Sequence, residues 1–300
     1  MLSIIVCSNK DDEYFHNFTA NLQDTVGVPF EVIRIDNSKN KHSIFSAYNL
    51  GASRSTMPYL CFVHEDVKFH TKNWGNKLIT HLSVPKTGIV GIAGCTALTR
   101  IPTPWTWNPS FINIIQSNNN SNKSKKTAKF PKNTNRTRES IVMLDGVFLC
   151  MRKDLFGTIK FDEIIFDDFH AYDFDICIQS HVQGYNNYMA NDILIEHFSR
   201  GNRDYTYYNN LLKVYKKWEK HLPLYAENFS EKDRTKALGK ERMQLDRLII
   251  KLSSTRFDKS EIMRTFARYS HKINPQKRIN LNRAKFLLAV SRLFFHNQKG

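Results

Sequence analysis

Apolar and polar residues alternate in blocks along the first 95 residues. Four short runs are apolar at both odd and even positions, as in strands buried on both faces; they are 2–8, 30–36, 59–66 and 88–94. The segments between them carry apolar residues at helical spacing, and they are 12–23, 43–53 and 74–81. This alternation predicts an α/β domain with a mixed, mainly parallel sheet flanked by helices.

The alternation resumes after residue 139. Residues 140–156 read as two strands joined by a small turn, and 169–185 as a helix. A last strand is predicted within 191–201 and ends on His197. From residue 204 onward the spacing is helical, which predicts a C-terminal helical extension.

Residues 116–138 interrupt this order. They contain one Phe as their only large apolar side chain and no acidic residue, so they cannot bury a core of their own. We expect a mobile loop here. Such a loop is either a lid near a substrate cleft or a solvated insertion.

The charge is unevenly divided along the chain. Residues 1–199 hold 20 Lys and Arg against 19 Asp and Glu, whereas residues 200–300 hold 24 against 9. The near-neutral first part argues against a nucleic-acid-binding domain, whose footprint is basic. We therefore expect one domain at 1–202 and a basic helical extension at 203–300.

The five cysteines have no paired spacing and lie mostly within apolar runs. This is typical of buried thiols in a reducing compartment. The first residues show no signal-peptide pattern, and no apolar run reaches about 18 residues. We expect a cytoplasmic protein.

Polar side chains follow the first three predicted strands. In mainly parallel sheets, ligands bind beyond the carboxyl ends of the strands. These ends carry Ser8, Asn9, Asp36, Asn37, His64, Glu65 and Asp66. The sequence therefore predicts a ligand site at this edge of the sheet.

Five stretches of the first 200 residues follow a known pattern. They are SIIVCS, VIRIDNS, AYNLGASRSTMPYLCFVHEDV, FDDFHAYDFDICIQSHVQGY and IEHFSRG. Together they resemble the family-2-like glycosyltransferases of the GT-A fold, in particular their bacterial capsule and surface-polysaccharide branch. The resemblance implies a hexosyltransferase-type enzyme with a nucleotide-sugar donor and Mn²⁺ or Mg²⁺ as cofactor.

In that family an Asp-x-Asp motif follows the third strand and holds a cation on the donor diphosphate. It aligns here with His64, Glu65 and Asp66, so a histidine replaces the first acid. The resemblance implies that Asp66 binds the metal and that His64 and Glu65 lie beside the donor. A hard cation would neutralise the charge that develops on the leaving diphosphate. Taken alone, three polar residues after a strand are ordinary loop chemistry.

Further donor contacts implied by the resemblance lie after the first two strands and in the second helix. They are Ser8, Asn9, Asp36, Asn37 and Asn49. Asp36 and Asn37 equally fit a turn, because both residue types favour turns. Asn49 equally fits simple helix packing.

Asp173 falls where the family's Glu-Asp pair supplies the catalytic base. Here Tyr172 precedes it, so only the aspartate is kept. Inverting transfer needs one carboxylate to deprotonate the acceptor hydroxyl from the face opposite the leaving nucleotide. The alternative is an acid that stabilises the start of a helix, which is also our interpretation of Asp175, unless that residue pairs with an arginine.

His197 matches a late histidine that completes the metal or diphosphate site in some relatives. A lone histidine near a strand end is otherwise a packed or capping residue. Ser199 and Arg200 follow it and suit phosphate contacts.

Acceptor contacts are predicted in a Pro-bounded loop and at a turn. The indole faces of Trp105 and Trp107 suit stacking on sugar rings. Asp145 is placed beside them by the resemblance. Two tryptophans in a loop also suit anchoring of that loop to the core.

From these residues we predict a metal-dependent, inverting glycosyltransferase. It would move a sugar from a nucleotide donor to a hydroxyl of a glycan or lipid-linked acceptor in surface polysaccharide synthesis. Because His64 and Tyr172 replace acids, an inactive sugar-nucleotide-binding scaffold is the alternative. A nucleic-acid-binding protein acting through the basic last third is the other, and the near-neutral first part argues against it.

The basic extension allows two interpretations. Aromatic and aliphatic residues recur at helical spacing with Lys and Arg between them. Such helices lie on an anionic membrane surface, which would place the protein at the inner face of the membrane. Alternatively, they pack as a bundle on the first domain or on a second copy of the chain, as a homo-oligomer.

Overall fold

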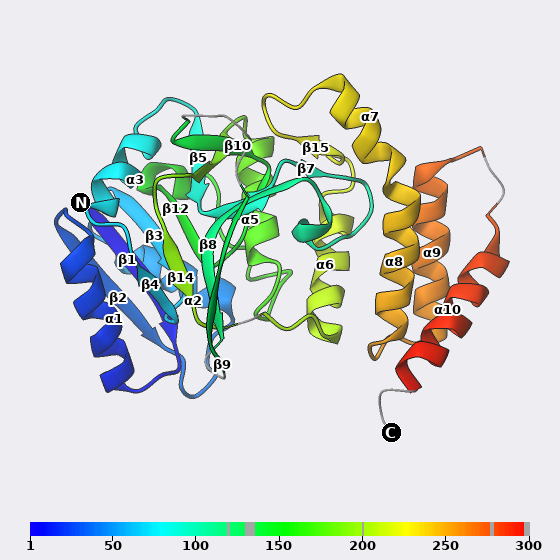
Figure 1. Cartoon of the computed structure of the whole chain (residues 1–300), viewed down its shortest axis with the longest axis horizontal. Helices are drawn as coiled ribbons and strands as arrows, with labels where there is room; N and C mark the ends of the chain where they lie inside the picture. Colours follow the sequence, from blue (N-terminus) through cyan, green and yellow to red (C-terminus); the bar gives the residue numbers. More distant parts are fainter. Residues whose placement is uncertain (119–120, 130–135, 200, 277–278, 297–300) are drawn as a thin grey trace.

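The computed structural model describes residues 1–118, 121–129, 136–199, 201–276 and 279–296. Two β-sheets and their flanking helices occupy the chain up to His197, and helices dominate the remaining C-terminal part (Figure 1). The predicted α/β architecture, a mixed sheet flanked by helices, is confirmed.

The larger sheet has seven strands. In spatial order they are β10 (Arg138–Ile141), β13 (Asn186–Ala190), β5 (Thr87–Gly91), β12 (Phe148–Arg152), β3 (Tyr59–Val63), β1 (Leu2–Ser8) and β2 (Phe30–Asp36). β1 is parallel to β2 and β3, and β5 is parallel to β13. β12 is antiparallel to both neighbours, and β10 is antiparallel to β13. The carboxyl ends of β1, β2 and β3 therefore share one edge.

Helices cover both faces of this sheet, which explains why its strands are apolar at odd and even positions. The helices are α1 (Asp12–Thr25), α2 (Ile44–Arg54), α3 (Trp74–Leu82), α4 (Lys153–Phe156) and α5 (Tyr172–Val182). Side chains alternate along a strand, so Ile4 of β1 joins a core with α1 and α3, and Ile5 joins another with α2 and α5.

Gly51 lets α2 lie directly on β1. A Cβ atom at this position would be 2.2 Å from Cγ2 of Ile5. Close packing of the helix on the strand therefore accounts for this glycine, because any side chain would force the two apart.

Gly51→Ala is expected to lower the free energy of unfolding by about 1–3 kcal/mol, since overpacking outweighs the better helix propensity of alanine. Urea denaturation measures the change. Gly239→Ala is the matched control, because nothing lies within 4 Å of a Cβ at that helix end. Equal midpoints for the two variants would contradict the packing argument.

The second sheet has six strands and lies over the edge where the site forms. Its strands are β11 (Met143–Leu144), β6 (Ala93–Cys95), β8 (Ser110–Asn118), β14 (Ile195–His197) and β4 (Val67–Phe69), with β9 (Ser121–Lys129) pairing on β8. β14 and β4 are antiparallel, and their register places His197 opposite Val67. This pairing brings the end of β14 beside Asp66.

The loop prediction for 116–138 is wrong where the structure describes strands. β8 continues to Asn118, and β9 pairs with it in antiparallel register, for example Gln116 with Lys125. The prediction rested on the lack of large apolar side chains, but ladder bonds join main-chain groups and do not require them. Residues 119–120 and 130–135 of the predicted loop lie outside the described residues.

The chain after residue 202 is mainly helical, as predicted. Its elements are α6 (Tyr205–Lys217), β15 (Leu224–Tyr225), α7 (Glu231–Gly239), α8 (Glu241–Ser253), α9 (Lys259–Ile273) and α10 (Leu281–His296). β15 pairs with β7 (Ala97–Leu98), which precedes the 3₁₀ turn η1 (Trp105–Trp107). No helix within the described part of the chain is long and apolar enough to span a membrane.

This helical extension packs on the sheets. Leu248 of α8 and Phe266 of α9 belong to the same apolar cluster as Leu98 and Ile101. Arg100 bonds to Glu241 with its main-chain amide and its guanidinium. The helical-bundle interpretation thus describes how α8 and α9 are held, and α10 lies against them (Figure 1).

Candidate functional site

A cavity of about 720 Å³ opens at the carboxyl ends of β1 and β3. Ten residues singled out from the sequence line it. They are Asn9, Asn37, His64, Glu65, Asp66, Trp105, Asp145, Asp173, His197 and Ser199. Side chains separated by up to about 190 positions in the sequence therefore meet in one space.

Four other predicted residues are placed outside the lining of this cavity. Ser8 is buried and accepts a bond from the amide of Lys10, because side chains alternate and Cys7 faces the cavity instead. Asp36 is exposed and accepts from the amide of Ser38 at 2.9 Å, as in the turn that we considered. The two remaining residues, Asn49 and Trp107, have other partners.

The amide of Asn49 donates to the carbonyl of Phe161 at 2.8 Å, which ties α2 to the segment before α5. Trp107 lines a separate hollow, and the guanidinium of Arg247 lies 4.3 Å from its ring. Both side chains therefore have partners outside the cavity.

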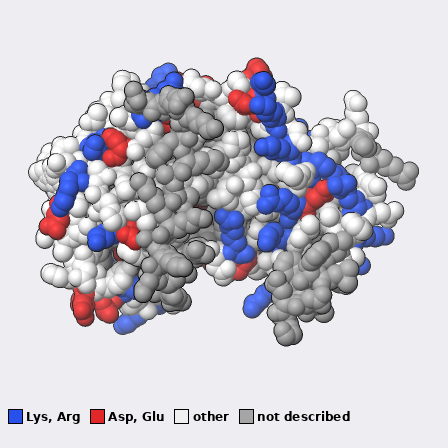
Figure 2. Space-filling view, in the orientation of Figure 1, with Lys and Arg blue, Asp and Glu red and all other residues white. Residues whose placement is uncertain are grey.

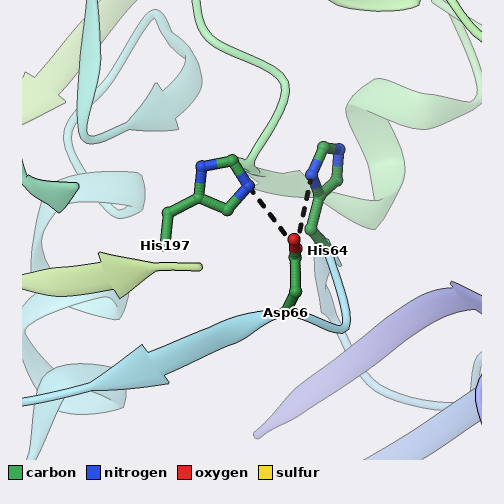
Figure 3. A group of neighbouring side chains, drawn as sticks. All are labelled: His64, Asp66 and His197. Atoms are coloured by element: carbon green, nitrogen blue, oxygen red, sulfur yellow. Dashed lines mark ion pairs between the residues drawn. The ribbon is translucent and has the colours of Figure 1, made fainter. Parts of the chain in front are cut away.

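Asp66 lies between two histidines (Figure 3). Its Oδ1 atom is 3.4 Å from Nε2 of His197 and 3.9 Å from Nδ1 of His64. One ligand atom from each of the three residues lies within 4.8 Å of the others. Two imidazoles and a carboxylate at this spacing form a donor set that fits one divalent cation.

Hydrogen bonds hold the backbone in place at each of the three residues. β3 ends at Val63, and the amide of His64 donates to the carbonyl of Val147. The amide of Phe198 donates to the carbonyl of Asp66 at 3.0 Å. The Gln116 side chain donates to the carbonyl of His197 at 3.1 Å. The metal-ligand candidates thus rest on strand ends, which hold them rigidly.

The two histidines and Asp66 affect one another's protonation. Burial acts to raise the pKa of Asp66, but the hydrogen bond and charge of His197, with the Ser199 hydroxyl and His64, hold it well below 3.8. Burial lowers the pKa of His64, and the neighbouring His197 lowers it further. An ionised carboxylate and a neutral imidazole are the forms that bind metals.

The two positions that depart from the family pattern are in contact. Nε2 of His64 lies 2.7 Å from the hydroxyl of Tyr172, although 108 positions separate them. A Cβ at Gly146 would lie 2.2 Å from this hydroxyl, so the turn after Asp145 must be glycine for Tyr172 to fit. The hydroxyl orients the imidazole and leaves Nδ1 facing Asp66.

Asp173 lies in the first turn of α5 and lines the cavity together with Asp145. Burial raises its pKa to about 7, and the charge of Asp145 adds to this, while main-chain amides, including that of Gly146, partly oppose it. No ion pair between described residues involves Asp173. A carboxylate that changes charge near neutral pH is suited to accept a proton.

Asp175 has a different environment on the same helix. It is buried and lies 2.7 Å from Nζ of Lys217, and it accepts a bond from the indole of Trp218. The expected partner was an arginine, and the structure provides a lysine. These bonds tie α5 to α6, so Asp175 has a structural role.

Two of the three residues predicted to contact the acceptor, Trp105 and Asp145, are bonded to each other. The indole of Trp105 donates to Oδ2 of Asp145 at 3.1 Å, and the amide of Val147 donates to Oδ1. Trp105 is nearly buried, so it anchors its loop and also orients this carboxylate. The rings of His170 and Tyr207 meet edge to face nearby and line the same cavity.

Several residues of the cavity were not found from the sequence. Lys10 is the one Lys or Arg among the described lining residues, and it directly follows the predicted Asn9. Its position just beyond a strand end was an available signal. Tyr207 and Phe169 offered no signal in the sequence, since they reach the cavity only through the packing of α6 and of the loop before α5. Ser199 lines the cavity, and Arg200 lies outside the described residues.

Comparisons with known proteins add family and fold information. A family model described as "Glycosyltransferase like family" matches residues 3–217, which end with α6. A search of curated proteins found no match.

Among solved structures, the chain resembles GalNAc-T7 crystallised with UDP, GalNAc and Mn²⁺, with a TM-score of 0.53 and 11% identity over 90% of this chain. The chain spans 55% of that protein. TarS 1-349 of S. aureus in complex with UDP-GlcNAc has a TM-score of 0.44 and 10% identity, over 93% of this chain and 74% of TarS. The expected GT-A-like fold is confirmed by the family match and the GalNAc-T7 likeness.

Proposed function

Because the chain belongs to the glycosyltransferase-like family, we propose that its cavity binds a nucleotide sugar and transfers the sugar, with inversion, to an acceptor hydroxyl. One observation carries this proposal. The same cavity contains a cation-binding arrangement at His64, Asp66 and His197 and an acidic side chain, Asp173, with a pKa of about 7. These are the two components that the reaction needs.

The residues present fit a divalent cation. Their ligand atoms converge, Asp66 is ionised at neutral pH, and the pKa of His64 is lowered. His64, Asp66 and His197 would hold the ion. When bound, the ion supplies positive charge that stabilises a diphosphate leaving group. That GalNAc-T7 was solved with Mn²⁺ and UDP agrees with this assignment.

Residues at the strand ends would hold the rest of the donor. Asn9 and Asn37 offer amide groups to hydroxyls and ring nitrogens of the nucleotide. The ammonium of Lys10 would contact phosphate oxygens. Glu65, which has a buried carboxylate oxygen without a partner among the described residues, would accept from a donor hydroxyl or amide.

Asp173 would accept the proton of the acceptor hydroxyl at its carboxylate. Its pKa near the operating pH gives it enough basicity to take the proton and enough ionised form to act. Asp145, held by Trp105, would orient the acceptor through its hydroxyls. Phe169 and Tyr207 add aromatic ring surface to the same cavity.

The contact of His64 with Tyr172 bears on the inactive-scaffold alternative. The replacement of two acids suggested a decayed site, yet the new side chains bond to each other and orient a metal ligand. A matched pair argues for a modified site that still functions. We therefore favour the enzyme over the scaffold.

Nucleotide release from UDP-sugars is expected with Mn²⁺ and at least about tenfold slower with Mg²⁺ at equal concentration. Two of the three donors are imidazole nitrogens, which suit Mn²⁺ better than the strictly oxygen-preferring Mg²⁺. A coupled assay of free UDP measures this, in buffer that is first stripped of metal and then supplied with one of the two ions. Release that is equal with chelator and with Mn²⁺ would exclude the metal site, and the absence of release with every donor and ion would favour the scaffold.

The acceptor and location are also part of this proposal. We propose a hexose transfer to a glycan or lipid-linked acceptor of a surface polysaccharide, in the cytoplasm beside the inner face of the membrane. Exposed Lys and Arg of the extension support peripheral contact with anionic lipid (Figure 2). Self-association through the C-terminal helices is a further proposal, because Leu281 and Phe286 of α10 are exposed.

A further inference from the structure

A second hollow, of about 800 Å³, lies between the sheets and the C-terminal helices. Three parts of the chain form it: η1, the start of α6 and the end of α8. The lining residues that matter for its chemistry are Trp107, Arg203, Asp204, Arg247, Lys251 and Arg256. We call it the basic hollow, because four cations and one acid line it.

The four cations of the basic hollow have no acidic partner within the described part of the chain, and they face one space. No ion pair between described residues involves Arg203, Arg247, Lys251 or Arg256. Some other cations of the extension are paired; Glu219 bonds to both Arg268 and Lys272, and Asp246 to Arg242 and Arg283. Figure 2 shows Lys and Arg gathered over α6 and α8.

The one acid of the hollow is already engaged. Asp204 caps α6 and accepts bonds from the amide of Tyr207 and from the side chain of Asn202. It forms no ion pair with the four cations among the described residues, so a single negative charge faces four positive ones. The start of α6, whose first amides face outward, adds further positive potential.

The basic hollow adjoins the acceptor side of the main cavity. The turn η1 places Trp105 in the cavity and Trp107 in the hollow. Arg203 donates to the hydroxyl of Thr106 at 3.1 Å and lies over the ring of Tyr207, which lines the cavity. One extended acceptor could thus reach both.

Taking the proposed function as given, we propose that the basic hollow binds a phosphate group of the acceptor while its hydroxyl lies at Asp173. Guanidinium groups bind phosphate oxygens through paired hydrogen bonds, and Lys251 adds a point charge. The half-buried face of Trp107, with Arg247 at 4.3 Å, suits stacking against an adjoining sugar. The acceptor class is therefore a phosphate-bearing glycan or polyol.

Calorimetric titration with inorganic pyrophosphate in metal-free buffer tests the site. Among the described residues that line the main cavity, four carboxylates face one lysine, which disfavours the probe there. The double variant Arg247→Gln with Lys251→Gln is expected to weaken binding at least tenfold. The control Lys259→Gln with Arg264→Gln removes the same charge from exposed positions of α9 and should stay within twofold.

Three results would overturn the proposal. They are the absence of pyrophosphate binding, equal weakening in both double variants, and weakening by Lys10→Gln instead, which would put the probe in the main cavity. UDP-sugar binding is measured in parallel and should be unchanged in the Arg247 and Lys251 variant. If UDP-sugars fail to bind wild-type protein while pyrophosphate still binds the hollow, the proposed function fails and the anion site stands.

Competition against pyrophosphate identifies the source of the phosphate. Displacement by vesicles carrying a polyprenyl-diphosphate sugar supports a lipid-linked acceptor. Displacement by a soluble glycerol-phosphate oligomer supports a phosphodiester polymer. Displacement by a single-stranded oligonucleotide alone would overturn the acceptor assignment and favour a nucleic-acid site.

Discussion

Replacing Asp173 with asparagine is expected to slow sugar transfer by about 100- to 10,000-fold, the range typical of losing a general base. Affinity for the UDP-sugar should stay within about twofold, because the carboxylate lies beside Asp145, on the side where we propose that the acceptor binds. The wild-type rate should rise with pH up to about 7, as the carboxyl group loses its proton, and then level off. Initial rates and nucleotide-sugar titrations across pH 5–9 measure both quantities.

The same substitution should raise stability at alkaline pH. The folded-state pKa of about 7 lies above the ordinary 3.8, so the folded protein holds a proton that the unfolded chain releases. This contribution is fully present below pH 3.8 and is lost as pH rises through about 7. The displacement corresponds to at most ~4 kcal/mol, and partial hydration reduces it, so we expect Asp173→Asn to gain about 2 kcal/mol at pH 8 and less than half of that at pH 5.

Asp175→Asn provides the contrast on the same helix. This carboxylate holds Lys217 and Trp218, so its loss should cost about 1–3 kcal/mol of stability and leave transfer per folded molecule nearly unchanged. The two variants should therefore shift stability in opposite directions, and only Asp173→Asn should slow transfer. Full transfer by Asp173→Asn at pH 7.5 would show that another group is the base.

The sheet could be predicted from the sequence because its strands follow one simple rule. Residues such as Ile4 and Ile5 are both apolar, and a strand with helices on both faces needs this. The rule failed at β9, whose polar composition resembles that of a loop. Its pairing with β8 depends on main-chain groups, and these are the same in every sequence.

The site could be predicted as far as strand ends locate it. Asn9, Asn37 and Asp66 follow parallel strands whose ends share an edge, so their proximity is a consequence of topology. The bond between His64 and Tyr172 could not be predicted in this way. It joins positions 108 apart in the sequence, and their separation in space depends on how α5 packs.

The basic hollow could not be predicted from the sequence, for a similar reason. The sequence showed an excess of positive charge after residue 200, but it could not show which cations pair. Glu219 and Asp246 neutralise some of them, and only the fold leaves Arg203, Arg247 and Lys251 facing one space. A count of charged residues gives the net charge of a segment, but it does not show how the charges are arranged in space.

Asp66→Asn is expected to weaken Mn²⁺-dependent binding of UDP-sugars by at least about 100-fold. Asp66 contributes the only carboxylate of the three-residue donor set, and both histidines face it. An amide oxygen carries no charge to balance a divalent ion. Removing a ligand should weaken metal binding by more than the 10- to 100-fold that is typical of removing a residue that only bonds to a ligand. Titration with Mn²⁺, followed by the thermal stabilisation that a UDP-sugar adds, measures the effect.

Asp192→Asn is the matched control for this change. Asp192 also bonds to a histidine, His81, at 2.8 Å, and this bond helps to lower its pKa against the opposing effect of burial. Both variants should therefore lose some stability above pH 3.8, where the depressed pKa values favour folding. Only Asp66→Asn should also lose the stabilisation added by Mn²⁺ and donor. If it keeps that stabilisation, the ion binds elsewhere and His64 and His197 have a structural role.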